Sequence, residues 1–280
     1  MEELDIPTVT LNTGHAMPRV GLGTWPLVGR QSTDSILTAV SAGYRLIDTA
    51  AAYGNEDSVG AAVRESGLPR EELFVTTKLR GRHQGDAATV RQGLMESLEV
   101  LGLDYVDLYL IHWPNPARGR YVETYEALLE LAQHGLIRSV GVSNFTEEHL
   151  RKVVDATGVP PAVDQRQVSP SHAQAAFVDA LSASPTIIQA WSPLERNSGV
   201  LQDPVVTHIA ERLDVSPSQV VIRWLIERGL TTVPHSSNPE RQRRNADVFH
   251  FSLEPDDIAA ITALDSGKST ELTPDTFEEF

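Results

Sequence analysis

Short apolar runs rich in β-branched residues alternate along the chain with longer runs in which apolar residues recur every three or four positions. The first pattern is typical of buried strands, and the second is typical of helices that bury one face. The strand-like runs lie at residues 19–23, 45–48, 73–78, 105–111, 137–142, 162–166, 186–190 and 231–233. Clear helical patterns lie at residues 32–42, 86–101, 121–133 and 217–228. This alternation favours a closed parallel barrel, the (β/α)8 or TIM-barrel fold, over an open doubly wound sheet.

Residues at the ends of several runs suit helix termini. Thr146, followed by two glutamates, is expected to begin a helix, because its hydroxyl can cap the first turn and acidic side chains are favourable there. Glycine ends many helices because it adopts left-handed backbone conformations easily. Four glycines stand where helices should stop: Gly43, Gly102, Gly135 and Gly229.

Three segments lie outside the regular alternation. Residues 7–17 are predicted to form a β-hairpin before the barrel, since Asn12-Thr13-Gly14 separates two short extended runs. Two extra helices are expected at 204–213 and 255–265, and residues 266–280 form a polar tail. No low-complexity linker divides the chain, so we expect one domain over residues 1–280.

Composition excludes several classes of protein. The 280 residues are typical of a single α/β barrel, and the absence of cysteine excludes disulfides and thiolate sites. A formal net charge of −15 repels phosphate backbones and anionic lipid, so we expect no binding to nucleic acid or membranes. The acidic first ten residues lack the apolar core of a secretory signal. We therefore expect a cytoplasmic protein and, with no sign of a dimer seam, a monomer.

The glycine pattern of dinucleotide-binding folds is missing. No G-x-G-x-x-G sequence opens a predicted helix, and the nearest pair, Gly21 and Gly23, leads into Thr24-Trp25-Pro26. A dinucleotide cofactor is therefore not expected to bind in the Rossmann manner.

Four polar side chains stand at or just after the carboxyl ends of neighbouring predicted strands, where barrels of this type carry their chemistry. They are Asp48, Tyr53, Lys78 and His112. Singly, each has a structural explanation. Asp48 and Lys78 could form an ion pair at the barrel rim, His112 could be a buried core histidine, and Tyr53 could serve packing. No close His, Asp or Glu spacing accompanies His112, so no metal site is expected.

Together, these four residues suggest proton donation to a carbonyl group. A carboxylate keeps a neighbouring lysine charged, and a charged lysine lowers the pKa of a nearby tyrosine from about 10. Such a tyrosine can protonate a carbonyl oxygen as that oxygen becomes an alkoxide. A histidine alongside can orient the carbonyl or help to move the proton.

The surrounding motifs resemble those of the aldo-keto reductase superfamily, in particular the bacterial branch that includes 2,5-diketo-D-gluconate reductases. The resemblance runs from Gly21-Leu22-Gly23-Thr24-Trp25 to Pro274-Asp275-Thr276-Phe277. The specific motifs are Asp48-Thr49-Ala50-x-x-Tyr53-Gly54-Asn55-Glu56, Thr76-Thr77-Lys78-Leu79, Leu110-Ile111-His112-Trp113-Pro114 and Gly141-Val142-Ser143-Asn144-Phe145. The resemblance implies that Tyr53 is the general acid and that Lys78 and Asp48 tune it. It also implies that His112 positions the substrate carbonyl.

The resemblance further implies which residues hold the cofactor and line the substrate site. Trp191 would stack on the nicotinamide ring. Trp25 and Trp113 would line the substrate site, or alternatively only pack the top of the barrel. The implied cofactor-binding residues are Ser143, Asn144, Gln165, Trp191, Ser192, Leu194, His235, Ser236, Arg241 and Asn245.

Departures from the family pattern affect the expected cofactor preference. His235 stands where relatives carry lysine, and Arg244 where they carry glutamate. A neutral histidine attracts a 2′-phosphate less than lysine does, although Arg241 can still bind it bidentately. Arg244 would either compensate in charge or lie on a solvated face. We therefore expect NADPH as the cofactor, with NADH possible and the preference weaker than a lysine would give.

Departures near the substrate site leave two interpretations open. Arg80 and Arg82 could attract an acidic substrate or could lie on solvated surface. After the sixth strand, Gln165 is kept but its neighbours differ from the family pattern, so local repacking is expected there.

The sequence thus predicts an NADPH-dependent carbonyl reductase that acts on small aldehydes, ketones or dicarbonyls. Two alternatives remain. A nicotinamide-binding redox sensor or regulatory subunit would keep the cofactor residues but show little turnover. A cofactor-free barrel isomerase or lyase would leave four residues unexplained: Ser143, Asn144, Gln165 and Trp191.

Overall fold

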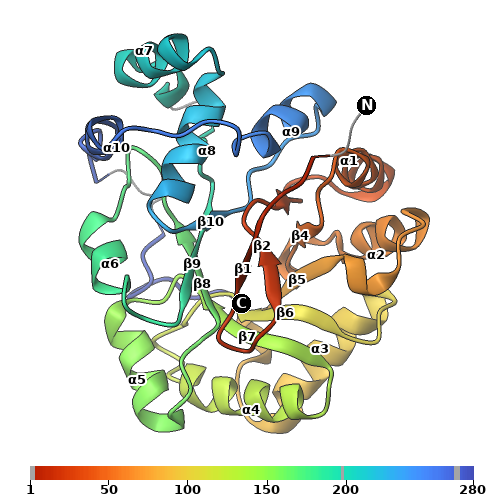
Figure 1. Cartoon of the computed structure of the whole chain (residues 1–280). Helices are drawn as coiled ribbons and strands as arrows, with labels where there is room; N and C mark the ends of the chain where they lie inside the picture. Colours follow the sequence, from red (N-terminus) through yellow and green to blue (C-terminus); the bar gives the residue numbers. More distant parts are fainter. Residues whose placement is uncertain (1–3, 197–198, 268–271) are drawn as a thin grey trace.

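Eight parallel strands stand at the centre of the computed structural model, which describes residues 4–196, 199–267 and 272–280 (Figure 1). They are β3 (Leu22–Gly23), β4 (Leu46–Asp48), β5 (Phe74–Leu79), β6 (Val106–Ile111), β7 (Ile137–Ser143), β8 (Val163–Gln167), β9 (Ile187–Trp191) and β10 (Thr231–Thr232). Each strand pairs with the next in chain order. A parallel bridge between Val20 and Thr232 joins the last strand to the segment before β3. The sheet therefore closes into the predicted (β/α)8 barrel.

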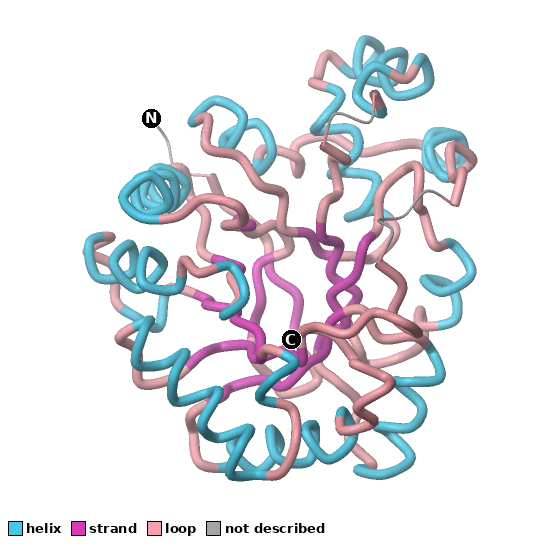
Figure 2. Tube along the Cα trace, turned by 180° about the vertical axis from the view of Figure 1, so that it is seen from behind, coloured by secondary structure: helices cyan, strands magenta, loops and turns pink. Residues whose placement is uncertain are grey.

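A ring of helices surrounds these strands (Figures 1 and 2). The barrel helices are α1 (Gly29–Ser41), α2 (Glu56–Glu65), α3 (Ala87–Leu101), α4 (Tyr121–Gln133), α5 (Glu147–Thr157), α6 (Ala175–Ala180), α8 (Pro217–Glu227) and α9 (Pro239–Ala246). The two predicted extra helices are α7 (Pro204–Leu213) and α10 (Pro255–Thr262). Helix α10 ends before the predicted residue 265 because its last turn tightens, with Leu264 N–H donating to the Ile261 carbonyl. None of the described helices is both long and apolar enough to cross a membrane.

The helix termini follow the sequence signals. At the start of α5, Thr146 Oγ1 accepts a hydrogen bond from His149 N–H at 3.3 Å. Gly102 ends α3 with a φ of 65°, a left-handed conformation that costs glycine little because it has no Cβ. The other predicted stops also have positive φ: Gly43, Gly135 and Gly229.

The predicted hairpin closes one end of the barrel. Strands β1 (Thr8–Thr10) and β2 (Ala16–Pro18) pair antiparallel. Met17 and Leu11 are buried in one apolar cluster with strand side chains that include Leu46. In Figure 1 this hairpin crosses in front of the strands. Because it covers their amino-terminal ends, the carboxyl ends at the opposite side are the open ones.

Candidate active site

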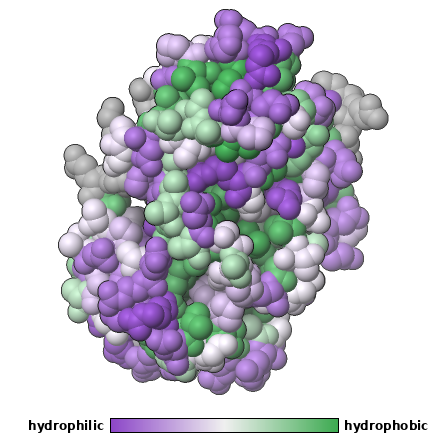
Figure 3. Space-filling model, turned by 60° about the vertical axis from the view of Figure 1, so that its left-hand side comes forward, coloured by the Kyte–Doolittle hydropathy of each residue, from purple (hydrophilic) through white to green (hydrophobic). Residues whose placement is uncertain are grey.

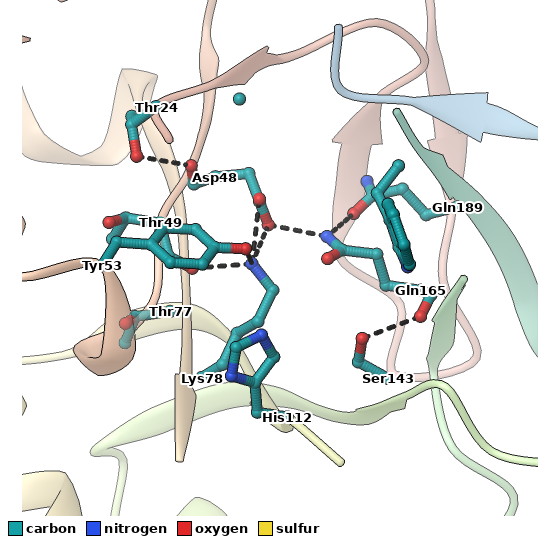
Figure 4. A network of polar contacts seen from close by, with 12 residues as sticks. Thr24, Asp48, Thr49, Tyr53, Thr77, Lys78, His112, Ser143, Gln165 and Gln189 are labelled. Atoms are coloured by element: carbon teal, nitrogen blue, oxygen red, sulfur yellow. Dashed lines mark hydrogen bonds and ion pairs between the residues drawn. The ribbon is translucent and has the colours of Figure 1, made fainter. Parts of the chain in front are cut away.

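The carboxyl ends of three neighbouring strands bring the four catalytic candidates together (Figure 4). Asp48 is the last residue of β4, and Lys78 lies next to the end of β5. His112 directly follows β6, and Tyr53 ends a short 3-10 helix, Ala51–Tyr53, after β4. Parallel strands in register end at the same rim, so side chains far apart in sequence meet there.

Lys78 is fully buried, and its ammonium group has several polar partners. Nζ donates to Asp48 Oδ1 at 3.0 Å, to Asp48 Oδ2 at 2.9 Å and to the Thr49 carbonyl oxygen at 2.8 Å. It also donates to Tyr53 Oη at 3.3 Å. A buried charge requires such partners, because removing it from water is costly. Since an ammonium group can only donate, Tyr53 Oη accepts this bond and keeps its own proton for another acceptor.

Burial raises the pKa of Tyr53, and the positive charge of Lys78 opposes this only in part. The expectation that Lys78 lowers the pKa of Tyr53 below its usual value is therefore wrong in net direction. A buried phenolate loses its hydration, and the charge of Asp48 also disfavours the phenolate. Burial lowers the pKa of Lys78, but Asp48 and Tyr53 raise it, and the net shift is upward. At neutral pH the pair is a neutral phenol beside an ammonium ion.

His112 faces Tyr53 across the site. The two ring centroids lie 5.8 Å apart with the planes at 76°. The Nδ1 atom of His112 lies 2.7 Å from Oε1 of Glu279, a buried residue of the tail. Glu279 is not among the site residues predicted from the sequence, because nothing in its local pattern distinguishes it from the acidic neighbours of a polar tail.

A cavity of about 700 Å³ opens beside these residues. Its volume is within the range of small-molecule and cofactor sites. The lining residues that the sequence predicted are Trp25, Asp48, Tyr53, His112, Trp113, Ser143, Asn144, Gln165, Trp191, Ser192, Leu194 and His235. Lys78 does not line the cavity itself. Three predicted cofactor-binding residues also lie outside the lining: Ser236, Arg241 and Asn245.

One wall of the cavity is held by hydrogen bonds around Asn144. This residue has a φ of 61°, which turns the chain at the end of β7. Asn144 Nδ2 donates to the His112 carbonyl oxygen at 3.1 Å and to Ser143 Oγ at 3.0 Å. Asn144 Oδ1 accepts from Trp191 Nε1 at 3.0 Å. The indole and the amide therefore have fixed positions in the wall.

Gln165 connects this wall to the catalytic residues. Its Nε2 donates to Asp48 Oδ1 at 2.6 Å and to Gln189 Oε1 at 2.7 Å (Figure 4). Gln189 is fully buried and was not predicted as a site residue. The available signal was a glutamine among the apolar residues Ile187, Ile188 and Ala190 of the predicted strand, which implied a polar partner inside the barrel. Next to Gln165 in β8, Arg166 stacks over the Phe177 ring at 3.4 Å.

The predicted phosphate-binding end of the site lies around the start of α9. His235 Nδ1 donates to the Gly23 carbonyl oxygen at 2.9 Å, and burial lowers the pKa of His235. The ring is therefore neutral at neutral pH. Arg241 is exposed, and its Nε donates to the buried Ser236 Oγ at 3.4 Å. Asn245 is buried in α9.

Three arginines whose roles were left open do not line the cavity. Arg244 pairs with Glu240 at 3.2 Å on an exposed helix face, and Arg82 pairs with Glu96 at 3.5 Å on the surface. Arg80 Nη2 donates to a main-chain oxygen of Phe280 at 2.7 Å. The solvated interpretation thus holds for Arg244 and Arg82, whereas Arg80 contacts the tail.

Two tryptophans flank the cavity. Trp113 is buried and packs edge-to-face on Phe277 with ring centroids 4.6 Å apart. Trp25 is 50% exposed, and the guanidinium of Arg196 lies 4.2 Å from its ring centroid. Both tryptophans therefore have packing partners as well as a face toward the cavity.

The chain matches known proteins over almost all of its length. The model of the Aldo/keto reductase family matches residues 19–266. The 2,5-diketo-D-gluconic acid reductase B of Corynebacterium sp. is 44% identical over 275 residues, which are 98% of this chain and 99% of that protein. An aldo-keto reductase of Mycolicibacterium vanbaalenii is 46% identical, and the match covers 97% of each protein.

Solved structures agree with these matches. The apo form of Gox0644 superposes with a TM-score of 0.92 at 39% identity, covering 98% of this chain and 99% of that one. A mutant of Gox0644 in complex with NADPH gives the same TM-score. The Bombyx mori aldo-keto reductase in complex with NADP has a TM-score of 0.89 at 34% identity, covering 95% of both chains.

Proposed function

Because the chain belongs to the aldo/keto reductase family, we propose that it is an NADPH-dependent reductase of small aldehydes, ketones or dicarbonyls. The observation that carries this proposal is the bond from Lys78 Nζ to Tyr53 Oη. It leaves the phenolic proton of Tyr53 for an acceptor in the cavity, and it places a positive charge where negative charge develops when that proton leaves.

The residues present fit a nicotinamide cofactor. The amide of Asn144 and the hydroxyl of Ser143 line the cavity and match the hydrogen-bonding groups of a carboxamide. Trp191 also lines it and offers a flat indole for ring stacking. Solved neighbours of this chain bind NADP or NADPH. The bound cofactor would supply the hydride, and the barrel would supply the geometry.

The protein side of the reaction consists of orientation and proton donation. A carbonyl oxygen between Tyr53 and His112 would accept the Tyr53 proton as the carbonyl carbon becomes an alcohol carbon. The Tyr53 phenolate left behind would be stabilised by Lys78, whose own charge is balanced by Asp48. Proton uptake from solvent would then restore the phenol. Trp25 and Trp113 would exclude water from the same space.

The first test compares the wild-type protein with Tyr53→Phe. NADPH absorbance should fall only when a carbonyl compound is added, with a diketo sugar acid, a small dicarbonyl and an aromatic aldehyde as the panel. Tyr53→Phe should lower turnover by about 10²- to 10⁴-fold, the contribution typical of a positioned general acid. Binding of NADPH, followed by tryptophan fluorescence, should remain close to wild type.

Tyr105→Phe is the matched control, since Tyr105 packs against Arg70 and Arg138 away from the cavity. Wild-type turnover in Tyr53→Phe would contradict the assignment of Tyr53 as the general acid. Tight nucleotide binding without turnover on any carbonyl would favour a redox sensor. No binding of either nucleotide would contradict the proposal and favour cofactor-free chemistry.

A further inference from the structure

The carboxylate of Glu279 reaches His112 from a segment 167 residues further along the chain. Its Oε1 lies 2.7 Å from His112 Nδ1, and its Oε2 accepts from the Gly81 N–H at 3.0 Å. The N–H of Glu279 itself donates to Asn115 Oδ1 at 2.6 Å. Glu279 is only 9% exposed. These contacts fix the carboxylate at the mouth of the barrel.

The tail segment, residues 272–280, packs tightly on the loop after β5. A Cβ at position 81 would lie 1.8 Å from the Glu279 carbonyl oxygen, so this approach requires a glycine there. Phe277 packs on Trp113, and Arg80 donates to a main-chain oxygen of Phe280 at 2.7 Å. In Figure 2 the chain end marked C lies over the strands, inside the ring of helices.

The contact determines which nitrogen of His112 carries a proton. A carboxylate accepts hydrogen bonds and cannot donate, so Nδ1 must be the protonated atom of the pair. The same bond resists a flip of the ring, which would move Nδ1 away from the carboxylate. Within the described residues no hydrogen bond engages the second ring nitrogen, Nε2, and His112 lines the cavity. The hydrogen bond that one ring nitrogen makes sets the protonation of the other, so such a carboxylate influences the chemistry of the imidazole.

We propose that Glu279 is a positioning residue for His112. It holds a proton on Nδ1 and fixes the ring so that Nε2 faces the reacting oxygen of the substrate. Nε2 carries a lone pair in this tautomer, so it accepts a hydrogen bond from the alcohol hydroxyl and donates to the carbonyl oxygen only when the ring is doubly protonated. This inference rests on the proposed function, since the oxygen that changes between carbonyl and alcohol in that reaction is the partner of Nε2. The tail segment then acts on the reaction through His112, in addition to shaping the cavity.

The proton position can be measured without turnover by ¹⁵N NMR of the histidine side chains. The His112 signals are identified by their loss in His112→Gln. In the wild-type protein Nδ1 should be protonated, and in Glu279→Ala the proton should move to Nε2 or exchange between the two nitrogens. An unprotonated Nδ1 in the wild type, or identical spectra in both proteins, would overturn the proposal. This result is independent of whether the chain reduces carbonyls.

Kinetics then test the consequence for the reaction. Glu279→Ala should lower kcat/KM for the carbonyl substrate by about tenfold or more, because a misoriented group loses alignment with the reacting atoms. The dissociation constant of NADPH should not change. Glu279→Gln should restore most of the loss, since its amide oxygen can still accept from Nδ1–H.

Glu278→Ala is the matched control for the tail segment. Glu278 is the neighbouring acid, and its Oε1 accepts from the Ala117 N–H at 2.6 Å rather than contacting His112. Its replacement should leave kcat/KM close to wild type. If Glu278→Ala loses as much activity as Glu279→Ala, general anchoring of the tail explains the effect and the proposal fails. Failure of Glu279→Gln to restore activity would also contradict it.

Discussion

At the scale of single residues, the preference between NADPH and NADH depends on His235. Its Nδ1 proton is engaged by the Gly23 carbonyl oxygen, and burial lowers its pKa. A neutral ring that is already hydrogen-bonded offers little attraction to a 2′-phosphate. Arg241 is the charged group that hydrogen-bonds to Ser236, and without a charge on residue 235 we expect only a modest preference for NADPH.

His235→Lys should raise the ratio of kcat/KM for NADPH to that for NADH by about tenfold. The reason is that a charge-assisted contact with the phosphate contributes roughly 1–1.5 kcal/mol. Steady-state kinetics with both cofactors and one carbonyl substrate measure this ratio. His235→Gln, which also lacks a charge, serves as the control and should leave the ratio low. An unchanged ratio in His235→Lys would show that residue 235 does not face the phosphate.

At the scale of elements, α2 crosses the end of α3 at a distance that only glycine permits. A Cβ at Gly60 would lie 1.8 Å from the carbonyl oxygen of Leu101 and 2.6 Å from its carbonyl carbon. Both atoms belong to the backbone at the end of α3, so neither can rotate away. Their approach fixes the distance between the helices that follow β4 and β5, the strands that carry Asp48 and Lys78.

Gly60→Ala should lower the free energy of unfolding by about 1–3 kcal/mol, the usual cost of forcing extra volume into a packed contact. In an unconstrained helix the same change is stabilising by about 0.5–1 kcal/mol. The sign of the change in unfolding free energy therefore shows whether the close contact is present. Urea denaturation followed by circular dichroism measures the difference. Ala61→Gly, on the same helix, calibrates the ordinary effect of a helical glycine. Greater stability of Gly60→Ala would contradict the close contact.

At the scale of the whole molecule, the part of the surface that the structure describes has few features that favour association of two copies. The formal net charge is −15, and like charges repel. On the face drawn in Figure 3, hydrophobic areas are interrupted by hydrophilic residues. Among the described residues, the exposed large apolar side chains come from several separate segments: Trp25, Val28, Met95, Val100, Val154, Val159, Leu272 and Phe280. Scattered exposed residues of this kind do not form the continuous patch of a stable interface.

We therefore expect a monomer in solution. Size-exclusion chromatography with light scattering should give a mass near the 30.6 kDa of one chain. The mass should stay the same at raised ionic strength, where repulsion between acidic surfaces is screened. A mass of twice this value under either condition would contradict the expectation and point to an interface formed by side chains now counted as exposed.

The order of strands and helices was predictable from the sequence, because hydrophobic periodicity and helix-end signals are local. The barrel, the hairpin and both extra helices follow from them, and the family and enzyme class expected from the motifs are confirmed. The grouping of four residues was also predictable from the sequence: Asp48, Tyr53, Lys78 and His112. The reason is that the carboxyl ends of neighbouring parallel strands must meet at one rim. Knowledge of the strand order was enough to group them.

Other features depended on the tertiary structure alone. The contact of Glu279 with His112 joins segments 167 residues apart, and no local pattern encodes where a polar tail returns to the barrel. Gln189 joins the site through Gln165, its partner on the neighbouring strand. The pKa of Tyr53 rises rather than falls, because the loss of hydration depends on everything packed around the phenol. Sequence determines which groups reach the rim, whereas burial and long-range contacts decide their partners and their charge.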